Sequence, residues 1–150
     1  MPYDALLRGR HSQAGHAYFV TTVLADRKQR CLEDFVSARI VIGEMRRLND
    51  EQAVTSLAFV VMPDHVHWLF QLGDSLQLAE LVKRFKARSA QRVNVPLCRR
   101  GALWQPNYYD RAVRADEDLR KIARYMVGNP FRAGLASEAG SYPHWDAAWL

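Results

Sequence analysis

The chain has 150 residues, of which 49% are hydrophobic, and this suits one compact domain and excludes a disordered chain. No apolar run reaches the roughly 18 residues of a membrane span, and residues 1–10 lack the apolar core of a secretory signal, so we expect a cytoplasmic protein. The formal net charge of +5 favours an anionic partner, and nucleic acid is the commonest such partner.

Apolar periodicity and turn residues predict the element order strand, helix, strand, strand, helix, strand, helix. In chain order the elements are residues 16–24, 32–48, 53–62, 65–72, a helix from Ser75 to a loop at 95–102, residues 108–113 and 116–127. Asp34 and Ser75 are candidate N-caps of the first two helices. Pro63-Asp64 is a turn signal that makes the second and third strands a hairpin. Gly128-Asn129-Pro130 ends the last helix, because proline lacks the backbone donor.

The first six elements match the βαββαβ plan of a ferredoxin-like antiparallel sheet. Helices would cover one face of this sheet and leave the other face for a ligand or for the last helix. We therefore expect an α+β fold with an additional C-terminal helix that carries Tyr125. A single domain would fill residues 1–150, with its core at about 16–135 between a basic N-terminal arm and a tail (133–150) that folds back or frays.

Two histidines, His65 and His67, lie two apart on the third predicted strand. Because strand side chains alternate between faces, both imidazoles point the same way, and Val66 and Trp68 point into the opposite layer. Two neutral imidazoles side by side bind a divalent metal ion well. A bare His-x-His pair is more often two histidines on a half-exposed strand, so its surroundings decide. Asp64 either orients one imidazole or caps the turn, and turn capping is the favoured interpretation.

The surroundings of the histidine pair contain further motif pieces in a familiar order. The pieces are residues 18–22 (YFVTT), 62–69 (MPDHVHWL), 103–105 (LWQ), 108–111 (YYDR), 125–130 (YMVGNP) and 132–135 (RAGL). Together they resemble the single-tyrosine transposases among the HUH (histidine–hydrophobic–histidine) nucleases, and within that branch the REP-associated tyrosine transposases. The joint match is specific, although any one piece is not.

The resemblance implies a role for each motif residue. His65 and His67 would bind Mg²⁺ or Mn²⁺, and Tyr125 on the last helix would be the nucleophile. Asn129, one turn further on, would be the third metal ligand, where some relatives carry the longer glutamine. Residues four apart share one face of a helix, which agrees with a joint role for Tyr125 and Asn129.

The implied chemistry is attack of Tyr125 on a DNA phosphate. It would leave a 5′-phosphotyrosine and a free 3′-hydroxyl, which can reverse the step on another end. A tyrosine hydroxyl is a weak nucleophile, and a divalent ion would polarise the phosphoryl oxygens. No histidine or carboxylate close to Tyr125 in the sequence is an evident candidate for the base that would deprotonate its hydroxyl. Members of this branch recognise REP hairpins, so the implied substrate is single-stranded or hairpin DNA.

Basic and aromatic residues are the candidate DNA contacts, because single-stranded DNA is held through its phosphates and through base stacking. The N-terminal arm contributes Arg8 and Arg10, and one face of the second helix contributes Lys83, Lys86, Arg88 and Arg92. The aromatic candidates near the fourth strand are Trp104, Tyr108 and Tyr109. A disordered arm and a solvated helix face are the alternatives for the basic residues. One or two of the aromatic residues are expected in the core.

Three functions are compatible with these features. The leading one is a metal-dependent, single-stranded DNA endonuclease and strand transferase, that is, a transposase. The alternatives are a hairpin-DNA-binding protein without chemistry and an unrelated hydrolase that uses the histidine pair and a water nucleophile. The intact His65, His67 and Tyr125 argue against the binding-only alternative. A monomer and a homodimer that exchanges the tyrosine helix are both open, because the short connection at 101–107 does not decide between them.

Overall fold

The computed structural model describes residues 13–97, 99–114, 117–135 and 143–148. Its centre is a five-stranded antiparallel sheet in the order β4-β1-β3-β2-β5. The strands are β1 (Ala17–Val23), β2 (Val54–Val61), β3 (His65–Leu72), β4 (Tyr109–Ala112) and β5 (Trp145–Ala147). The first four strands have the order of a ferredoxin-like sheet, so the predicted α+β fold is confirmed.

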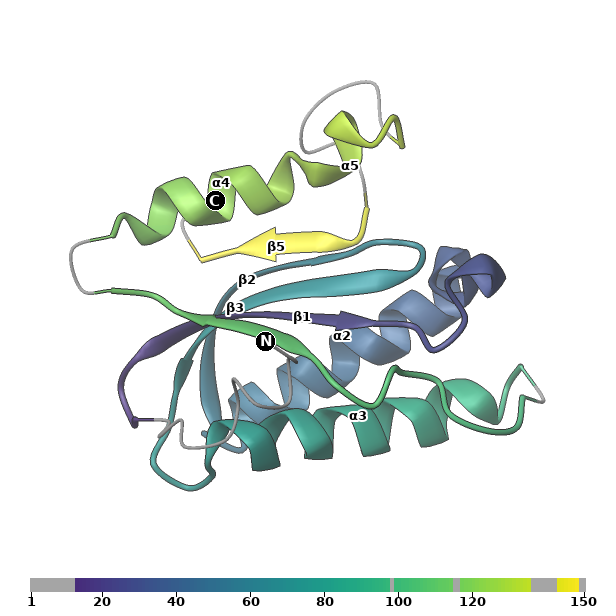
Figure 1. The fold of residues 1–150 in the computed structure, drawn as a ribbon, viewed down its shortest axis with the longest axis horizontal. Helices are drawn as coiled ribbons and strands as arrows, with labels where there is room; N and C mark the ends of the chain where they lie inside the picture. Colours follow the sequence, from purple (N-terminus) through teal and green to yellow (C-terminus); the bar gives the residue numbers. More distant parts are fainter. Residues whose placement is uncertain (1–12, 98, 115–116, 136–142, 149–150) are drawn as a thin grey trace.

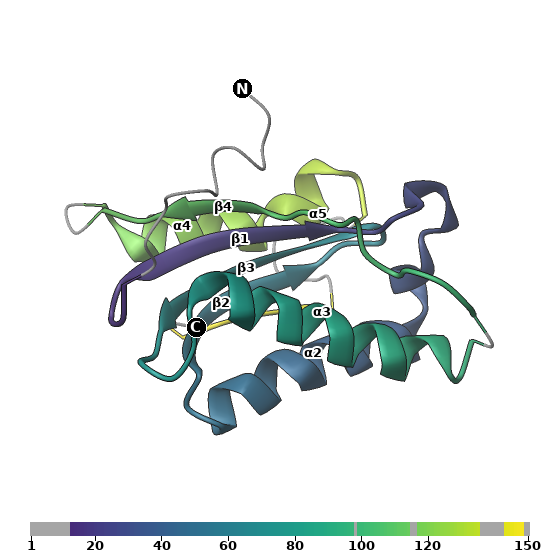
Figure 2. The same ribbon diagram turned by 60° about the horizontal axis from the view of Figure 1, so that its bottom comes forward.

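Helices lie on both faces of this sheet (Figure 1). They are α2 (Phe35–Asp50), α3 (Leu78–Asn94), α4 (Leu119–Val127) and the short α5 (Asn129–Arg132), with the 3-10 turns η1 (Arg27–Gln29) and η2 (Cys31–Glu33) before α2. The helices α2 and α3 pack together on one face, as the rotated view in Figure 2 also shows. On the other face α4 packs against β2 and β5. Within the described ranges, no helix combines the length and the apolar character of a membrane span.

Each face of the sheet has its own apolar core. The core between the sheet and the helices α2 and α3 includes Val66, Trp68 and Phe70 of β3. A smaller core under α4 includes Leu69 of β3 and Met126 of α4. This alternation along β3 is the pleat of a strand, and it confirms that Val66 and Trp68 point away from the histidine pair.

Capping side chains explain where two of the helices begin. Asp34 accepts a hydrogen bond at 2.9 Å from a backbone N–H in the first turn of α2, as predicted. Asp118 accepts from two backbone N–H groups of α4, so this helix begins at Leu119, later than its predicted start. The prediction for α3 is wrong, because Gln77 and not Ser75 is the N-cap residue, and its side chain makes no capping hydrogen bond.

The C-terminal region refines the prediction in two places. The helix α4 ends at Val127 with Gly128 as its C-cap, but α5 follows at once, so Asn129 begins a new helix. The tail folds back over residues 143–148, where Ala147 of β5 pairs with Ala58 of β2. Strand β5 thereby extends the sheet beyond the ferredoxin-like plan and supplies part of the surface on which α4 packs.

Candidate active site on the central strand

The histidine pair lies at the start of β3, on the face covered by α4. The ring centroids of His65 and His67 are 4.7 Å apart in an edge-to-face arrangement. The Nδ1 atom of His65 lies 2.7 Å from Oδ1 of Asp64, and the Nδ1 atom of His67 lies 2.8 Å from the hydroxyl oxygen of Thr21. Because an oxygen engages each Nδ1 atom, the two Nε2 atoms remain as candidate metal donors.

Asp64 orients His65 and does not cap the turn. One carboxylate oxygen bonds the imidazole, and the other accepts a hydrogen bond from Nε of Arg27 at 2.8 Å. Burial raises the pKa of Asp64, but the hydrogen bonds from His65 and Arg27 outweigh burial, so the pKa lies below its ordinary value. An ionised carboxylate accepts the Nδ1 proton and leaves the lone pair on Nε2. The favoured turn-capping interpretation is therefore wrong.

His67 is held neutral by its surroundings. Thr21 pairs directly with it across β1 and β3, and the Phe19 ring packs against it with centroids 5.4 Å apart. Burial, followed by the charges of His65 and Arg132, lowers the pKa of His67 to about 4. The imidazole is therefore uncharged near neutral pH, which is the state that a metal ligand requires.

Tyr125 projects from the exposed side of α4. Its side chain is 65% exposed, whereas Ala123, Met126 and Val127 of the same helix are buried. The buried residues fix the helix on the sheet, and the phenol remains accessible to a large substrate. The guanidinium of Arg132 lies over the phenol ring, with its central carbon 3.9 Å from the ring centroid.

Asn129 lies beside Tyr125 although it belongs to a separate helix. Arg132 Nη2 donates to Asn129 Oδ1 at 2.9 Å and also to the backbone carbonyl oxygen of Tyr125. One guanidinium thus contacts both residues, and its charge is among the causes that lower the pKa of His67. In the described part of the chain, no three histidine, cysteine or acidic side chains form a metal-binding group.

Two of the predicted DNA contacts are buried, and a third is half-buried. Trp104 and Tyr108 are buried in the core on the α3 side, and Trp104 Nε1 donates to the hydroxyl of Ser89 at 2.9 Å. Lys86 donates to backbone carbonyls of the 105–107 loop at 2.7 and 2.8 Å, and burial lowers its pKa to about 8. The burial of two rings agrees with the expectation that one or two of these aromatic residues lie in the core. As DNA contacts these three residues are corrected, because the two rings are unavailable for stacking and the lysine holds a loop.

Two of the other predicted cations of α3 pair with acidic residues of α2 and of its C-cap. Arg88 donates to both oxygens of Glu51, and Arg92 pairs at 2.7 Å with the buried carboxylate of Glu44. Lys83 is exposed. The helix α3 lies on the sheet face opposite the histidine pair, so its basic residues are not part of the candidate site. Arg8 and Arg10 lie outside the described residues.

Several residues of the site had no assigned role in the sequence reasoning. The hydroxyl of Thr21 contacts His67, and Arg27 donates to Asp64. Arg132 lies over the ring of Tyr125. Tyr109, which the sequence offered as a candidate stacking residue, pairs with Thr21 across β4 and β1, so its ring, which is 55% exposed, shares the face of the histidine pair. Strand register is the signal that would have found Thr21, and it depends on pairing between distant segments.

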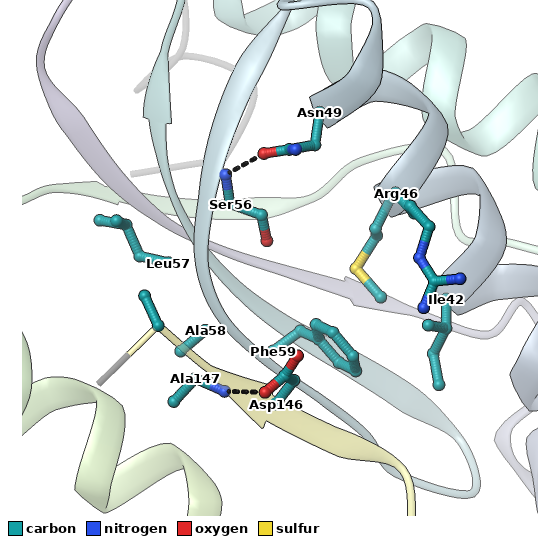
Figure 3. A pocket seen from close by; sticks show the side chains of 11 residues that line it. Ile42, Arg46, Asn49, Ser56, Leu57, Ala58, Phe59, Asp146 and Ala147 are labelled. Atoms are coloured by element: carbon teal, nitrogen blue, oxygen red, sulfur yellow. Dashed lines mark hydrogen bonds between the residues drawn. The ribbon is translucent and has the colours of Figure 1, made fainter. Parts of the chain in front are cut away.

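A pocket of about 210 Å³ between α2, β2 and β5 lies away from these residues (Figure 3). Two of its polar side chains serve the backbone: Asn49 accepts from the N–H of Ser56 at 2.9 Å, and Asp146 accepts from the N–H of Ala147 at 2.8 Å. No histidine or cysteine is among its lining residues. The pocket therefore does not offer the chemistry of the histidine pair, and we place the candidate site on β3.

A histidine pair on the central strand of a ferredoxin-like sheet, with an exposed tyrosine on a helix over the same face, is the layout that the sequence motifs imply for a transposase. The family model "Transposase IS200 like" matches residues 13–129, and the chain belongs to this family, as the sequence motifs predicted.

The relatives share most of their length with this chain. A REP-associated tyrosine transposase of Escherichia coli (strain K12) is 26% identical over 140 residues, which cover 89% of this chain and 78% of the relative. A Haemophilus influenzae protein designated a REP-associated tyrosine transposase is 24% identical over 140 residues, covering 87% and 78%. This chain also matches the solved structure of a REP-associated tyrosine transposase bound to a REP hairpin, with a TM-score of 0.75 at 20% identity. The match covers 91% of this chain and 79% of that one, and it supports the fold.

Proposed function

We propose that the protein is a metal-dependent enzyme that nicks single-stranded DNA and transfers the cut strand, with Tyr125 as its nucleophile. The observation that carries this proposal is the pair of imidazoles whose Nδ1 atoms are engaged by Asp64 and Thr21. Proteins orient metal-binding histidines in this way. The relatives are REP-associated transposases, and one solved neighbour is bound to a REP hairpin, which supports a hairpin DNA of that kind as the substrate.

The ion that the sequence motifs imply is Mg²⁺ or Mn²⁺. His65 and His67 would hold it through two neutral imidazoles, and Asn129 would add an amide oxygen, which is the kind of donor that these hard ions prefer. A set of three protein ligands leaves positions for phosphate oxygens and water. When bound, the ion would neutralise charge on the scissile phosphate and polarise its oxygens.

Tyr125 would carry out the covalent step. Attack of its hydroxyl oxygen on the phosphorus would form a tyrosine–phosphate bond and break the bond to the 3′ oxygen. The products would be a 5′-phosphotyrosine and a free 3′-hydroxyl. The energy of the phosphodiester is kept in the covalent link, so no nucleotide cofactor is consumed. The 3′-hydroxyl of another strand would reverse the step and complete the transfer.

We propose that the DNA strand lies on the part of the sheet beside the site. The helix α4 packs against β2 and β5, and β1 and β4 form the other half of the same sheet face (Figure 1). Tyr109 lies two strands from His67, a backbone separation of about 10 Å at the usual strand spacing. A base stacked on the exposed Tyr109 ring would bring the adjoining phosphate towards the histidine pair.

The test is the capture of a covalent protein–DNA adduct. A single-stranded oligonucleotide with a REP-type hairpin, labelled at its 3′ end, is incubated with the protein and Mg²⁺ or Mn²⁺ and separated on a denaturing gel. We expect the label to migrate with the protein, and EDTA to prevent this. Tyr125→Phe should form no adduct, whereas the matched control Tyr109→Phe, which keeps an exposed ring on the same face, should form it.

Each other result would change the assignment. No adduct from the native chain with either metal contradicts the proposal. An adduct that survives Tyr125→Phe moves the nucleophile to another tyrosine. Cleavage without any adduct favours the alternative of a hydrolase with a water nucleophile.

A further inference from the structure

Arg132 contacts both parts of the site that come from the C-terminal helices. Its guanidinium lies over the Tyr125 ring, with the central carbon 3.9 Å from the ring centroid. Its Nη2 atom donates to the backbone carbonyl oxygen of Tyr125 and, at 2.9 Å, to Oδ1 of Asn129. We propose that Arg132 is a positioning residue that fixes the Tyr125 ring and the Asn129 amide for attack on the scissile phosphate. This inference rests on the proposed nuclease function and deepens it.

An exposed tyrosine needs such a partner. The buried residues of α4 fix the backbone, but a ring that is 65% exposed is free to change rotamer on a fast timescale unless something contacts it. A guanidinium is suited to this task, because its flat face stacks on an aromatic ring while its edge keeps N–H donors for hydrogen bonds. In Arg132 the guanidinium lies over the Tyr125 ring, and its Nη2 atom donates to the Tyr125 carbonyl oxygen near the end of α4.

The same contact sets the direction of the Asn129 amide. Arg132 has only donors, so the atom of Asn129 that faces it is the carbonyl oxygen and not the NH₂ group. A carbonyl oxygen has two lone pairs, and the arginine uses one of them. The second lone pair remains for an electropositive partner, which is the role proposed for Asn129.

The absent side chain of Gly128 leaves the space that the Arg132 guanidinium occupies. A Cβ atom at Gly128 would lie 2.7 Å from Nη1 of Arg132, so a side chain there would displace the guanidinium. The backbone of Gly128 has φ −76° and ψ −7°, which any residue adopts, so its conformation does not require glycine. The missing side chain leaves room for the arginine, and alanine at 128 would move Arg132 without removing its charge.

The test compares Arg132→Ala, Arg132→Lys and Gly128→Ala with the control Arg120→Ala, which removes the same charge from an exposed site at the start of α4. We expect Arg132→Ala and Gly128→Ala to slow single-turnover adduct formation about 10- to 100-fold, the usual effect of a misplaced reacting group. Arg132→Lys should recover little, since lysine lacks the flat fork. The DNA affinity of these variants should change no more than that of Arg120→Ala. Free guanidinium ion should partly restore the rate of adduct formation in Arg132→Ala.

A second readout does not depend on activity. The side-chain protons of Arg132 lie over an aromatic ring, so NMR should find them shifted upfield in the metal-free native chain. Tyr125→Leu and Gly128→Ala should both abolish this shift, and Arg120→Ala should leave it unchanged.

The outcomes separate this inference from the proposed function. An active native chain whose adduct rate is unchanged in Arg132→Ala and Gly128→Ala overturns the positioning role and leaves the nuclease intact. An absent ring-current shift also overturns it. A native chain that forms no adduct overturns the nuclease function, and the positioning role falls with it.

Discussion

Replacing Asp64 should weaken metal binding at the histidine pair while leaving the fold in place. Its carboxylate lies 2.7 Å from Nδ1 of His65, and no other acceptor is assigned to that nitrogen. The loss of such a partner typically reduces metal affinity by about 10- to 100-fold, which corresponds to roughly 1.4–2.7 kcal/mol. The Arg27 side chain on the other carboxylate oxygen is 58% exposed, so that ion pair contributes at most about 1 kcal/mol to stability.

Two substitutions at Asp64 separate charge from contact. Asp64→Asn keeps the shape and a hydrogen-bond acceptor but removes the negative charge, so we expect a loss near the lower end of the range. Asp64→Ala removes both, so the loss should approach the upper end. The control Arg27→Gln breaks only the outer ion pair, and it should bind the metal nearly as well as the native chain.

The assay is calorimetric titration of the metal-free protein with Mn²⁺, combined with thermal unfolding of each variant. The expected order of affinity is native, Arg27→Gln, Asp64→Asn and Asp64→Ala, with similar unfolding temperatures. Equal Mn²⁺ affinity in the native chain and Asp64→Ala would refute the reasoning, because it would mean that His65 is oriented without its carboxylate partner.

Three further results are expected. Tyr109→Ala should weaken binding of single-stranded DNA by the roughly 1–3 kcal/mol of one stacked base, measured by fluorescence anisotropy, whereas Tyr109→Trp should retain binding. His67 has a pKa of about 4 in the folded chain against an ordinary value of 6.5. The unfolded chain therefore binds that proton more tightly, so the free energy of unfolding should fall as the pH drops from 6.5 through 4. Urea titrations in EDTA measure this fall, and it should be smaller in His67→Gln. Arg92→Met should lower the unfolding free energy by about 1–3 kcal/mol, because it removes the 2.7 Å partner of the buried Glu44 carboxylate and leaves only Arg47 at 3.9 Å. The double variant with Glu44→Leu should recover much of this loss.

The fold followed from the sequence because its signals were local. The alternation of β3 and the apolar stripes of the helices identify their buried faces without knowledge of the rest of the chain. The N-cap at Asp34 depends on residues three positions apart and was predicted correctly, whereas the N-cap of α3 lacks a capping side chain and was not. Strand β5 has three residues, and its pairing with β2 joins segments about 90 positions apart, which no local pattern predicts.

The site was predictable only in part, for the same reason. His65 and His67 follow from spacing on one strand, but the partners of their Nδ1 atoms depend on register and turn geometry. The basic residues of α3 were wrongly grouped as a DNA-binding face. A row of cations in a sequence looks the same whether it faces DNA or the acidic residues of another helix. Glu44 and Glu51 are those acidic residues, and only the packing of α2 against α3 brings them to Arg92 and Arg88.

The position of Tyr125 depends on parts of the chain that lie on both sides of it in sequence. The helix α4 packs against β2, which precedes it, and against β5, which follows it. At this contact the two strands present Ala58 and Ala147, which pair with each other and are buried in the α4 core. Small side chains let a helix approach a sheet closely, and larger ones would raise α4 and carry Tyr125 away from the histidine pair. The C-terminal strand is therefore part of what sets the distance between the candidate nucleophile and the candidate metal ligands.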